Sequence, residues 1–328
     1  MEAVTISAIE AAADRIAGHV RRTPMANSAS LSELCGAPVH LKLEHWQETG
    51  AFKLRGATNA VLSLSDEERA RGVVAASTGN HGRALAHAAK KAGARCTVSM
   101  SKLVPQNKLD AIAALGAEIR IVGNSQDDAQ IEVDRLARED GMVPLPPFDH
   151  PDIIAGQGTI GLEIVKDLPD AETVLVPLSG GGLIAGVAAA IKAQAPGTRI
   201  VGISMARGAA MQASLAAGHP VEVKELPTLA DSLGGGIGLD NRLTFQMVRD
   251  LVDEVVLLTE AEIAAGMRHA YFQEREILEG GAAVGIAALL AGKVEARGPI
   301  VALLSGRNVA MDLHARIMAG ANGLEEAA

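Results

Sequence analysis

The chain has 328 residues, of which 48% are hydrophobic and 21% are charged, which suits one large or two medium globular domains. A formal net charge of −9 and an aromatic content of 2% argue against a nucleic-acid-binding surface, and no apolar run approaches the ~18 residues of a membrane span. The N-terminus offers no basic-then-apolar leader, and Cys35 and Cys96 make neither a disulfide framework nor a metal cluster. We therefore expect a cytoplasmic protein with an aliphatic core.

Short β-branched runs alternate with longer, Ala-rich helical patterns, which indicates βαβ units and parallel sheets. The predicted strands are residues 39–44, 72–77, 95–100, 118–122, 173–178, 199–204, 254–258 and 299–304. Helix starts are indicated by capping boxes, in which a Ser or Thr and a later Glu satisfy opposing backbone N–H groups: Ser7 with Glu10, Ser65 with Glu68, and Thr259 with Glu262. Helix ends are indicated by Gly93 and Gly116.

The order of these elements predicts two domains. Residues from about 50 to about 145 form three consecutive strand–helix pairs, enough for a small sheet of their own. The segment 143–148, Val-Pro-Leu-Pro-Pro-Phe, has the composition of a crossing back to a larger domain. We expect a large domain of residues 1–48 and 146–328, and a small domain of residues 49–145. The predicted architecture is α/β, with two open, twisted, mostly parallel sheets flanked by helices and an active site in the cleft between the domains.

Lys53 has an unusual local sequence, Gly-Ala-Phe-Lys-Leu-Arg-Gly-Ala at residues 50–57. It follows an aromatic residue in a glycine-bounded turn that enters a predicted helix. A partly desolvated amine at such a place is neutral and nucleophilic, and can hold an aldehyde cofactor as a Schiff base. The alternative is a plain helix start, because Lys-x-Arg-Gly also begins many ordinary helices.

A glycine-rich turn, Ser-Gly-Gly-Gly at residues 179–182, follows the predicted strand 173–178 and opens an Ala-rich helix. Successive backbone N–H groups and the helix N-terminus favour an anion there. A tight packing turn is one alternative. A dinucleotide site is another, because Gly180, Gly182 and Ala185 fit G-x-G-x-x-G/A, but that site needs an acidic residue after the next strand. The next strand ends in Ser204, so a single phosphate group is the better ligand.

Two further segments lie at predicted strand ends. Residues 77–82, Ser-Thr-Gly-Asn-His-Gly, offer consecutive N–H groups for a carboxylate, and Asn80 could donate to a phenolic oxygen. An ordinary polar helix-capping turn is equally consistent with them, and His81 taken alone indicates a structural role. Residues 305–308, Ser-Gly-Arg-Asn, place the hydroxyl of Ser305 where it could face a ring nitrogen, although many strands end in Ser-Gly.

A Schiff-base lysine, a phosphate loop, a carboxylate loop and a ring-facing hydroxyl together describe a pyridoxal-phosphate site. From about residue 5 to about residue 320 the chain resembles the threonine dehydratase and serine racemase family of fold-type-II pyridoxal-phosphate enzymes, which have a tryptophan synthase β-like fold. The residues that carry the resemblance are 51–56 (Ala-Phe-Lys-Leu-Arg-Gly), 77–82, 155–159 (Ala-Gly-Gln-Gly-Thr), 179–182 and 305–308. The resemblance implies that the large domain binds the cofactor and the small domain carries the carboxylate loop.

The resemblance also implies roles for single residues. Pyridoxal phosphate is expected to contact Phe52, Lys53, Asn80, Gly180, Gly181, Gly182 and Ser305. The substrate carboxylate is expected on Ser77, Thr78, Asn80 and His81. Glu279 matches a glutamate that lies near the ring in relatives, although a role as a helix-start cap fits it equally well.

Lys53 and Thr78 are the expected catalytic residues. Lys53 would remove the Cα proton, and Thr78 or the cofactor phosphate would protonate the leaving hydroxyl. A neutral Ser305 hydroxyl makes the ring a weaker electron sink than a carboxylate would, which favours loss of a β leaving group. The predicted reaction is β-elimination from a β-hydroxy α-amino acid, which yields a 2-keto acid and ammonia.

Four positions depart from the family pattern. Thr78 is bulkier than the serine of relatives that racemise serine, which argues against racemisation. The loop 204–210 lacks the carboxylates with which several relatives bind Mg or Ca, so we predict no metal. Some relatives have an arginine near Gln126, whereas the stretch 124–128 is acidic here and favours a substrate with an extra amine over 3-hydroxyaspartate. Arg307 replaces a usual small residue, either as a cation near the ring edge or in a surface ion pair.

Residues 77–86, 231–238 and 305–308 most resemble the dehydratase branch associated with hydroxyectoine utilisation. The amidine nitrogens of hydroxyectoine cannot react at such a site, so the expected substrate is a ring-opened 3-hydroxy-2,4-diaminobutyrate derivative. A general threonine/serine or 3-hydroxyaspartate dehydratase, an amino-acid racemase on the same scaffold, and a non-catalytic sensor are the alternatives. We expect a homodimer that binds a small amino acid and neither nucleic acid nor membrane.

Overall fold

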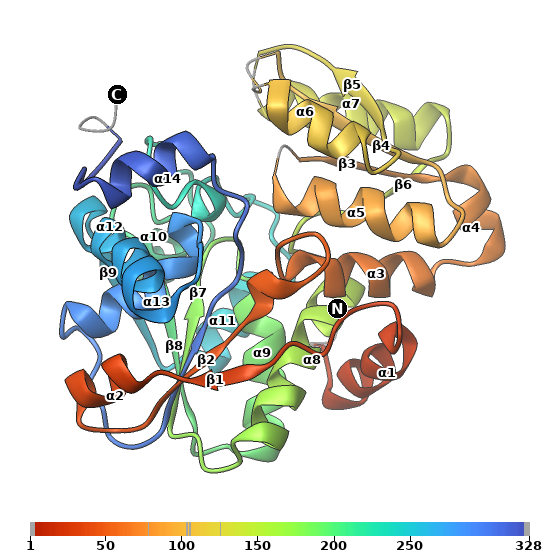
Figure 1. Ribbon diagram of the computed structural model, residues 1–328. Helices are drawn as coiled ribbons and strands as arrows, with labels where there is room; N and C mark the ends of the chain where they lie inside the picture. The colour runs from red at the N-terminus through yellow and green to blue at the C-terminus, as the bar shows by residue number, and fades with distance from the viewer. Residues whose placement is uncertain (1–3, 78, 103, 105, 125, 325–328) are drawn as a thin grey trace.

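The larger of two sheets has six strands in the order β1-β2-β10-β7-β8-β9, and all of its neighbours are parallel except β1 and β2 (Figure 1). The computed structural model describes residues 4–77, 79–102, 104, 106–124 and 126–324. The strands of this sheet are β1 (Met25–Asn27), β2 (Val39–Lys42), β7 (Thr173–Pro177), β8 (Arg199–Met205), β9 (Glu254–Leu258) and β10 (Ile300–Leu303).

The smaller sheet has four parallel strands in the order β5-β4-β3-β6. They are β3 (Val73–Ala76), β4 (Cys96–Met100), β5 (Glu118–Ile121) and β6 (Val143–Pro144). Every predicted strand is present, and the predicted α/β class with two mostly parallel sheets is confirmed. Strand β6 corrects the interpretation of residues 143–148, since the first two of them pair with β3 before the chain crosses over. A proline in this strand is tolerated because β6 lies at the sheet edge.

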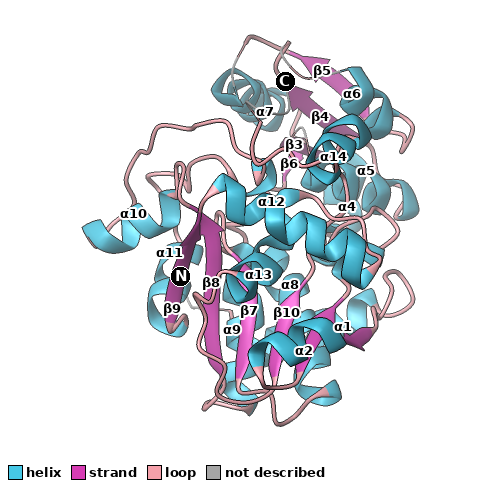
Figure 2. Ribbon diagram, turned by 60° about the vertical axis from the view of Figure 1, so that its left-hand side comes forward, coloured by secondary structure: helices cyan, strands magenta, loops and turns pink. Residues whose placement is uncertain are grey.

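Helices cover both faces of the larger sheet, and separate hydrophobic clusters lie on the two faces (Figure 2). One face is covered by α2 (Ala29–Cys35), α12 (Glu260–His269), α13 (Gly280–Leu290) and α14 (Met311–Met318). The other face is covered by α8 (Pro151–Asp167), α9 (Gly182–Gln194), α10 (Ala210–Ala217) and α11 (Thr244–Leu251), with α1 (Ile6–Ile16) packed outside α8 and α9. Short helical turns are η1 (Glu44–Trp46), η2 (Asp231–Leu233) and η3 (Ala270–Glu274).

The smaller sheet is likewise covered on both faces. Helices α3 (Lys53–Ser63), α5 (Asn80–Lys91) and α6 (Gln106–Ala113) pack on one face, α7 (Gln126–Glu139) packs on the other, and α4 (Asp66–Arg71) precedes β3.

Helix α3 joins the two sheets because it packs directly on α8. The two backbones approach closely: a Cβ on Gly156 would lie 2.6 Å from Cα of Gly56. Only glycine fits this contact, which therefore fixes the N-terminus of α3, where Lys53 lies.

Two of the three predicted capping boxes are present, at Ser65 with Glu68 and at Thr259 with Glu262. The prediction at Ser7 is wrong, because α1 begins at Ile6 and the Thr5 side chain caps it instead. In the part of the chain that the structure describes, no helix is long and apolar enough to cross a membrane.

Candidate active site

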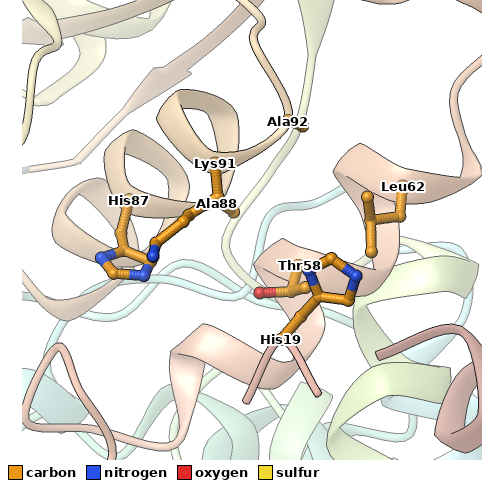
Figure 3. Close-up of a pocket in the computed structure, with 7 residues that line it drawn as sticks. All are labelled: His19, Thr58, Leu62, His87, Ala88, Lys91 and Ala92. Carbon is orange, nitrogen blue, oxygen red and sulfur yellow. The ribbon is translucent and has the colours of Figure 1, made fainter. Parts of the chain in front are cut away.

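A cavity of about 530 Å³ opens between the two sheets. It is lined by residues that follow β3, β7 and β10, at the carboxyl ends of parallel strands, where α/β proteins bind ligands. Its volume suits a small-molecule site. A second hollow, between His19, Thr58 and His87, has about 10 Å³ and holds no more than a water molecule (Figure 3). The large cavity is therefore the candidate site.

Lys53 is the first residue of α3 and lines this cavity. Its Nζ donates a hydrogen bond to the carbonyl oxygen of Pro147 at 2.5 Å and lies 5.3 Å from the centroid of the Phe52 ring. Burial lowers the pKa of Lys53 to about 8, although the negative charge of Glu279 acts in the opposite direction. A large fraction of this amine is therefore neutral and nucleophilic in mildly alkaline solution.

The glycine loop 179–182 connects β7 to α9 and lines the same cavity. A Cβ on Gly180 would lie 2.4 Å from the Phe148 ring, and one on Gly182 would lie 2.9 Å from Cα of Phe148. Gly181 has φ +90°, which side chains other than glycine rarely adopt. The loop therefore presents backbone N–H groups without side chains at the N-terminus of α9, which is the arrangement that an anion-binding site requires.

The loop 77–82 leads from β3 into α5 and faces the cavity. Ser77 Oγ accepts hydrogen bonds from the backbone N–H of Gly82 at 3.0 Å and of Gly79 at 3.4 Å, so this hydroxyl caps the helix. The first N–H groups of α5 have no carbonyl of their own helix to bind. Capping and anion binding are therefore compatible in one turn. Thr78 lies outside the described residues, and its catalytic role stays a prediction.

His81 is buried, and its Nε2 bonds with the carbonyl oxygen of Leu145 at 2.8 Å. Burial and the charge of Lys53 lower the pKa of His81 to about 3. The imidazole is therefore neutral near pH 7 and fastens α5 to the segment after β6. His81 Nδ1 is buried and has no hydrogen-bond partner among the described residues.

A hydrogen-bond network crosses the cavity from Asn80 to Glu279 and Asn308. Asn80 Nδ2 donates to Glu279 Oε1 at 2.8 Å, and Asn308 Nδ2 donates to Asn80 Oδ1 at 2.6 Å. The backbone N–H of Asn308 donates to Glu279 Oε2 at 3.1 Å. Glu279 precedes α13, but its side chain does not cap that helix. Its side chain instead lines the cavity, and its expected position near the ring stays a prediction.

Burial and the nearby charge of Asp231 together raise the pKa of Glu279 to about 7, although the hydrogen bonds that Ser232, Asn80 and Asn308 donate to it act in the opposite direction. The sequence interpretation assigned no role to Asn308, although it quoted the residue in 305–308. Its distance in sequence from Asn80, 228 residues, explains why no local pattern indicated the contact.

Ser305 follows β10, is 4% exposed and lines the cavity. Its carbonyl oxygen accepts a hydrogen bond from the backbone N–H of Phe52 at 3.0 Å, and Ala51 forms an isolated antiparallel β-bridge with Gly306. These contacts hold the segment before Lys53 beside the end of β10. The predicted ring-facing hydroxyl is therefore in the same cavity as the predicted Schiff-base lysine.

Two arginines also line the cavity, Arg83 of α5 and Arg307 after β10. Arg83 Nη1 donates to Asn308 Oδ1 at 3.2 Å. The sequence interpretation assigned no role to Arg83, although the residue lies within the segment 77–86 that was compared with the family branch. Arg307 is exposed, and within the described residues it makes no ion pair, so the surface-pair interpretation has no support there.

Two further predictions concern the acidic stretch 124–128 and a metal site. Of the acidic stretch 124–128, the described side chains are those of Asn124 and Asp128. Neither lines the cavity, and Asp128 Oδ2 accepts a hydrogen bond from the N–H of Asn124 at 2.7 Å. These two described residues lend no support to an extra substrate amine, and the preference expected from Gln126 and Asp127 stays a prediction. Among the described residues, no group of three or more His, Cys, Asp or Glu side chains is placed to bind a metal.

Residues 16–306 match the family model described as pyridoxal-phosphate dependent enzyme. A protein of Sinorhizobium fredii, provisionally named a threonine dehydratase, is 64% identical over 97% of this chain and 96% of its own length. An L-threonine ammonia-lyase of Thermotoga maritima is 42% identical over 96% of this chain and 78% of its own length.

Solved structures agree with this relationship. Maize serine racemase superposes with a TM-score of 0.91 at 34% identity, covering 94% of this chain and 95% of that one. Threonine deaminase isoform 2 from Solanum lycopersicum gives 0.88 at 35% identity, covering 96% and 86%. The chain therefore belongs to the pyridoxal-phosphate dependent enzymes of fold type II, in the family of the threonine dehydratases and serine racemases.

Proposed function

We propose that the protein dehydrates a β-hydroxy α-amino acid, with loss of the Cα proton and the β-hydroxyl, and that hydrolysis of the released product gives a 2-keto acid and ammonia. The observation that carries this proposal is the convergence of Lys53, the glycine loop 179–182, the loop 77–82 and Ser305 on one cavity. Relatives named threonine dehydratase and L-threonine ammonia-lyase support the same reaction class.

The residues present fit pyridoxal phosphate. The glycine loop 179–182 offers N–H groups to a phosphate, and added Cβ atoms would collide with Phe148 at two of its three glycines. Lys53 offers an amine with a lowered pKa, and Ser305 offers a buried hydroxyl in the same cavity. We assign Phe52 to the ring face and Asn80 to the phenolic oxygen.

When bound, pyridoxal phosphate withdraws electrons from the substrate Cα and so acidifies its proton. The neutral amine of Lys53 can take that proton, because its pKa of about 8 lies near the working pH of a general base. The N–H groups at the start of α5 can hold the substrate carboxylate. Thr78 remains our candidate to protonate the departing hydroxyl. Neutral His81 adds no positive charge beside Lys53.

We further propose that residues 1–48 with 146–328 move as one domain and residues 49–145 as another. The separate sheets and their separate hydrophobic clusters support this division. Hydrogen exchange is expected to protect residues 49–145 as one cooperative unit, and protection shared with the larger sheet would contradict it.

A cytoplasmic homodimer is the assembly we propose. The single tryptophan and the single tyrosine of the chain, Trp46 and Tyr271, are 41% and 39% exposed, and Phe272 and Met311 are exposed as well. The rings of Tyr271 and Phe272 lie 5.1 Å apart, and adjoining exposed apolar side chains mark an interaction site. Both cysteines are free, which fits a reducing compartment. Sedimentation of the purified protein as a monomer at micromolar concentration would contradict the dimer.

The test is release of keto acid and ammonia by the cofactor-loaded protein. The panel is L-threonine, L-serine, threo- and erythro-3-hydroxyaspartate, and ring-opened hydroxyectoine, which is our finer candidate. We expect turnover of at least one compound, and a loss of about 10³-fold or more in Lys53→Ala. The matched control Lys166→Ala changes an exposed lysine outside the cavity and is expected to stay within about twofold.

Each alternative predicts a different result on the same panel. Inversion of the Cα configuration without keto acid would replace the dehydratase with a racemase. Turnover that survives in Lys53→Ala would refute the assignment of the site.

A further inference from the structure

Arg83 is a charged side chain of the cavity that the proposed reaction leaves without a role. It is half-buried, and its one described hydrogen bond goes to a neutral acceptor, Asn308 Oδ1, at 3.2 Å. Within the described residues it makes no ion pair with a carboxylate. Burial lowers the pKa of Arg83 from its usual value, and the charge of Glu279 compensates in part.

A guanidinium keeps its proton near neutral pH, so its desolvation remains as an unfavourable free energy. Glu279 relieves little of it, since burial leaves that carboxyl only partly ionised near pH 7. The desolvated guanidinium of Arg83 therefore favours binding of an anion in the cavity, because the anion forms an ion pair with it. An Arg–carboxylate contact is also among the stronger hydrogen bonds of proteins.

Arg307 approaches the same corner from the other domain. Its Cγ and the Asn308 Oδ1 that binds Arg83 lie 3.3 Å and 2.7 Å from the position of a Cβ built on Gly50. Arg307 is exposed, however, and its charge also acts on Glu276. Solvent screens such a charge, so Arg307 contributes less than Arg83.

Two anions of the proposed reaction already have their own binding groups. The glycine loop 179–182 offers N–H groups to the phosphate, and the first turn of α5 offers N–H groups to the substrate α-carboxylate. Arg83 is therefore left for a third anionic group. Glu225 and Asp231 also line the cavity and would suit a distal amine, but both are exposed, so solvent screens their charges more than that of half-buried Arg83.

We propose, on the basis of the proposed dehydration, that Arg83, assisted by Arg307, binds an anionic group that the substrate carries beyond its β-carbon. The substrate class is then a β-hydroxy α-amino acid with an acidic side chain, which competes with ring-opened hydroxyectoine, the finer candidate that the sequence resemblance implies. Arg83 selects among substrates and takes no part in moving the Cα proton.

The experiment measures both equilibrium binding and turnover by the holoenzyme, with L-serine and the two 3-hydroxyaspartate diastereomers. These compounds share the reacting atoms and differ by one carboxylate. We expect a 3-hydroxyaspartate to bind more tightly than serine. Arg83→Gln should raise its Kd and KM by at least about tenfold and leave those of serine within about twofold. Arg307→Ser should raise the hydroxyaspartate values by about two- to fivefold.

Two further variants separate charge from folding. Arg83→Lys keeps the charge without the bidentate geometry, so it should recover part of the hydroxyaspartate affinity. Arg71→Gln removes a partly buried arginine of the same domain that pairs with Glu67 outside the cavity, and should match the wild type with every substrate. If Arg83→Gln does not fold, Arg83→Lys decides the question. The proposal then requires this variant to lose more affinity for 3-hydroxyaspartate than for serine.

Three results would overturn the proposal. Equal losses for serine and hydroxyaspartate in Arg83→Gln would mean that Arg83 binds the shared α-carboxylate. Unchanged hydroxyaspartate affinity would mean that it binds no substrate anion. Tighter binding of ring-opened hydroxyectoine with a free distal amine than of either hydroxyaspartate would mean that the cavity selects a cation. Anion-selective binding that depends on Arg83 without keto-acid release would instead refute the dehydratase and keep the anion site.

Discussion

Two groups of charged side chains differ in how completely they are paired. One surrounds Arg55 of helix α3, and the other lines the cavity. Arg55, two residues after Lys53, makes bidentate hydrogen bonds with Glu44 at 2.8 and 2.9 Å, and with Glu163 at 2.7 and 2.9 Å. Glu163 also binds Lys42, which is fully buried. In the cavity, Lys53 binds a carbonyl oxygen and Arg83 an amide oxygen, and neither has an ion pair among the described residues.

The pKa values of the two groups are shifted in opposite directions, because pairing dominates in the first group and burial dominates in the second. Burial acts to raise the pKa of Glu44, but the charge and hydrogen bonds of Arg55 outweigh it and the pKa is lowered. Burial acts to lower the pKa of Arg55, but the two glutamates raise it. In the cavity burial prevails, and brings Lys53 to about 8 and Glu279 to about 7. The charges of Arg55 and Glu44 are thus kept ionised, while Lys53 and Glu279 can change their protonation near neutral pH.

The largest expected effect is on the paired group. Arg55→Met leaves the carboxylates of Glu44 and Glu163 without their main partner, so we expect the free energy of unfolding to fall by about 3–5 kcal/mol. Arg135→Met is the matched control, because Arg135 pairs with Glu132 and Glu139 on the exposed side of α7 and its loss should lower the stability far less. Denaturant unfolding of both variants checks the difference. Equal losses in the two variants would remove the distinction between the groups.

A smaller effect is expected from the pH dependence of Glu279. Because its folded pKa lies above its unfolded value, the folded state binds more protons between pH 4.5 and 7, and its stability falls as the pH rises through that range. The component should be on the order of 2–3 kcal/mol and should be absent from Glu279→Gln. Unfolding of the cofactor-free proteins at pH 5 and pH 7.5 measures it.

Glu262→Gln is the control for this slope. The pKa of Glu262 is lowered, since the hydrogen bonds of Lys293 and Thr259 outweigh its burial, so its contribution to stability is present above pH 4.5 and is lost as the pH falls. Its removal should leave the slope between pH 5 and 7.5 unchanged. An identical pH dependence in the wild type and Glu279→Gln would show that Glu279 does not titrate as its burial requires.

The sequence predicted the parts of the molecule that local patterns determine. Strand periodicity located β7 and β8. The glycines of 179–182 predicted an anion-binding turn, and the close contact with Phe148 explains why two of these positions must be glycine. Lys53 was found because its neighbours alone make an unusual turn. At the N-terminus Thr5 and Ser7 both suit a helix cap, and the structure uses Thr5.

Contacts between distant segments could not be predicted in this way. Arg55 meets Glu163 across 108 residues, and Asn80 meets Glu279 across 199. Which charges are paired depends on these contacts, because α3 packs on α8 and α5 faces α13 only in the folded chain. The roles of Asn308 and Arg83 follow from the same contacts. Local sequence indicated a site, and the pairing of its charges required the structure.

The most direct test of this account is the pH dependence of the reaction between Lys53 and pyridoxal phosphate in the cofactor-free protein. The covalent bond requires the neutral amine, so its rate of formation should rise with pH and reach its midpoint near pH 8. Glu279→Gln removes a negative charge that favours the protonated amine, and should move the midpoint lower. A midpoint near 10.5, the ordinary value of a solvated lysine, would contradict the claim that the cavity leaves Lys53 unpaired and poised for chemistry.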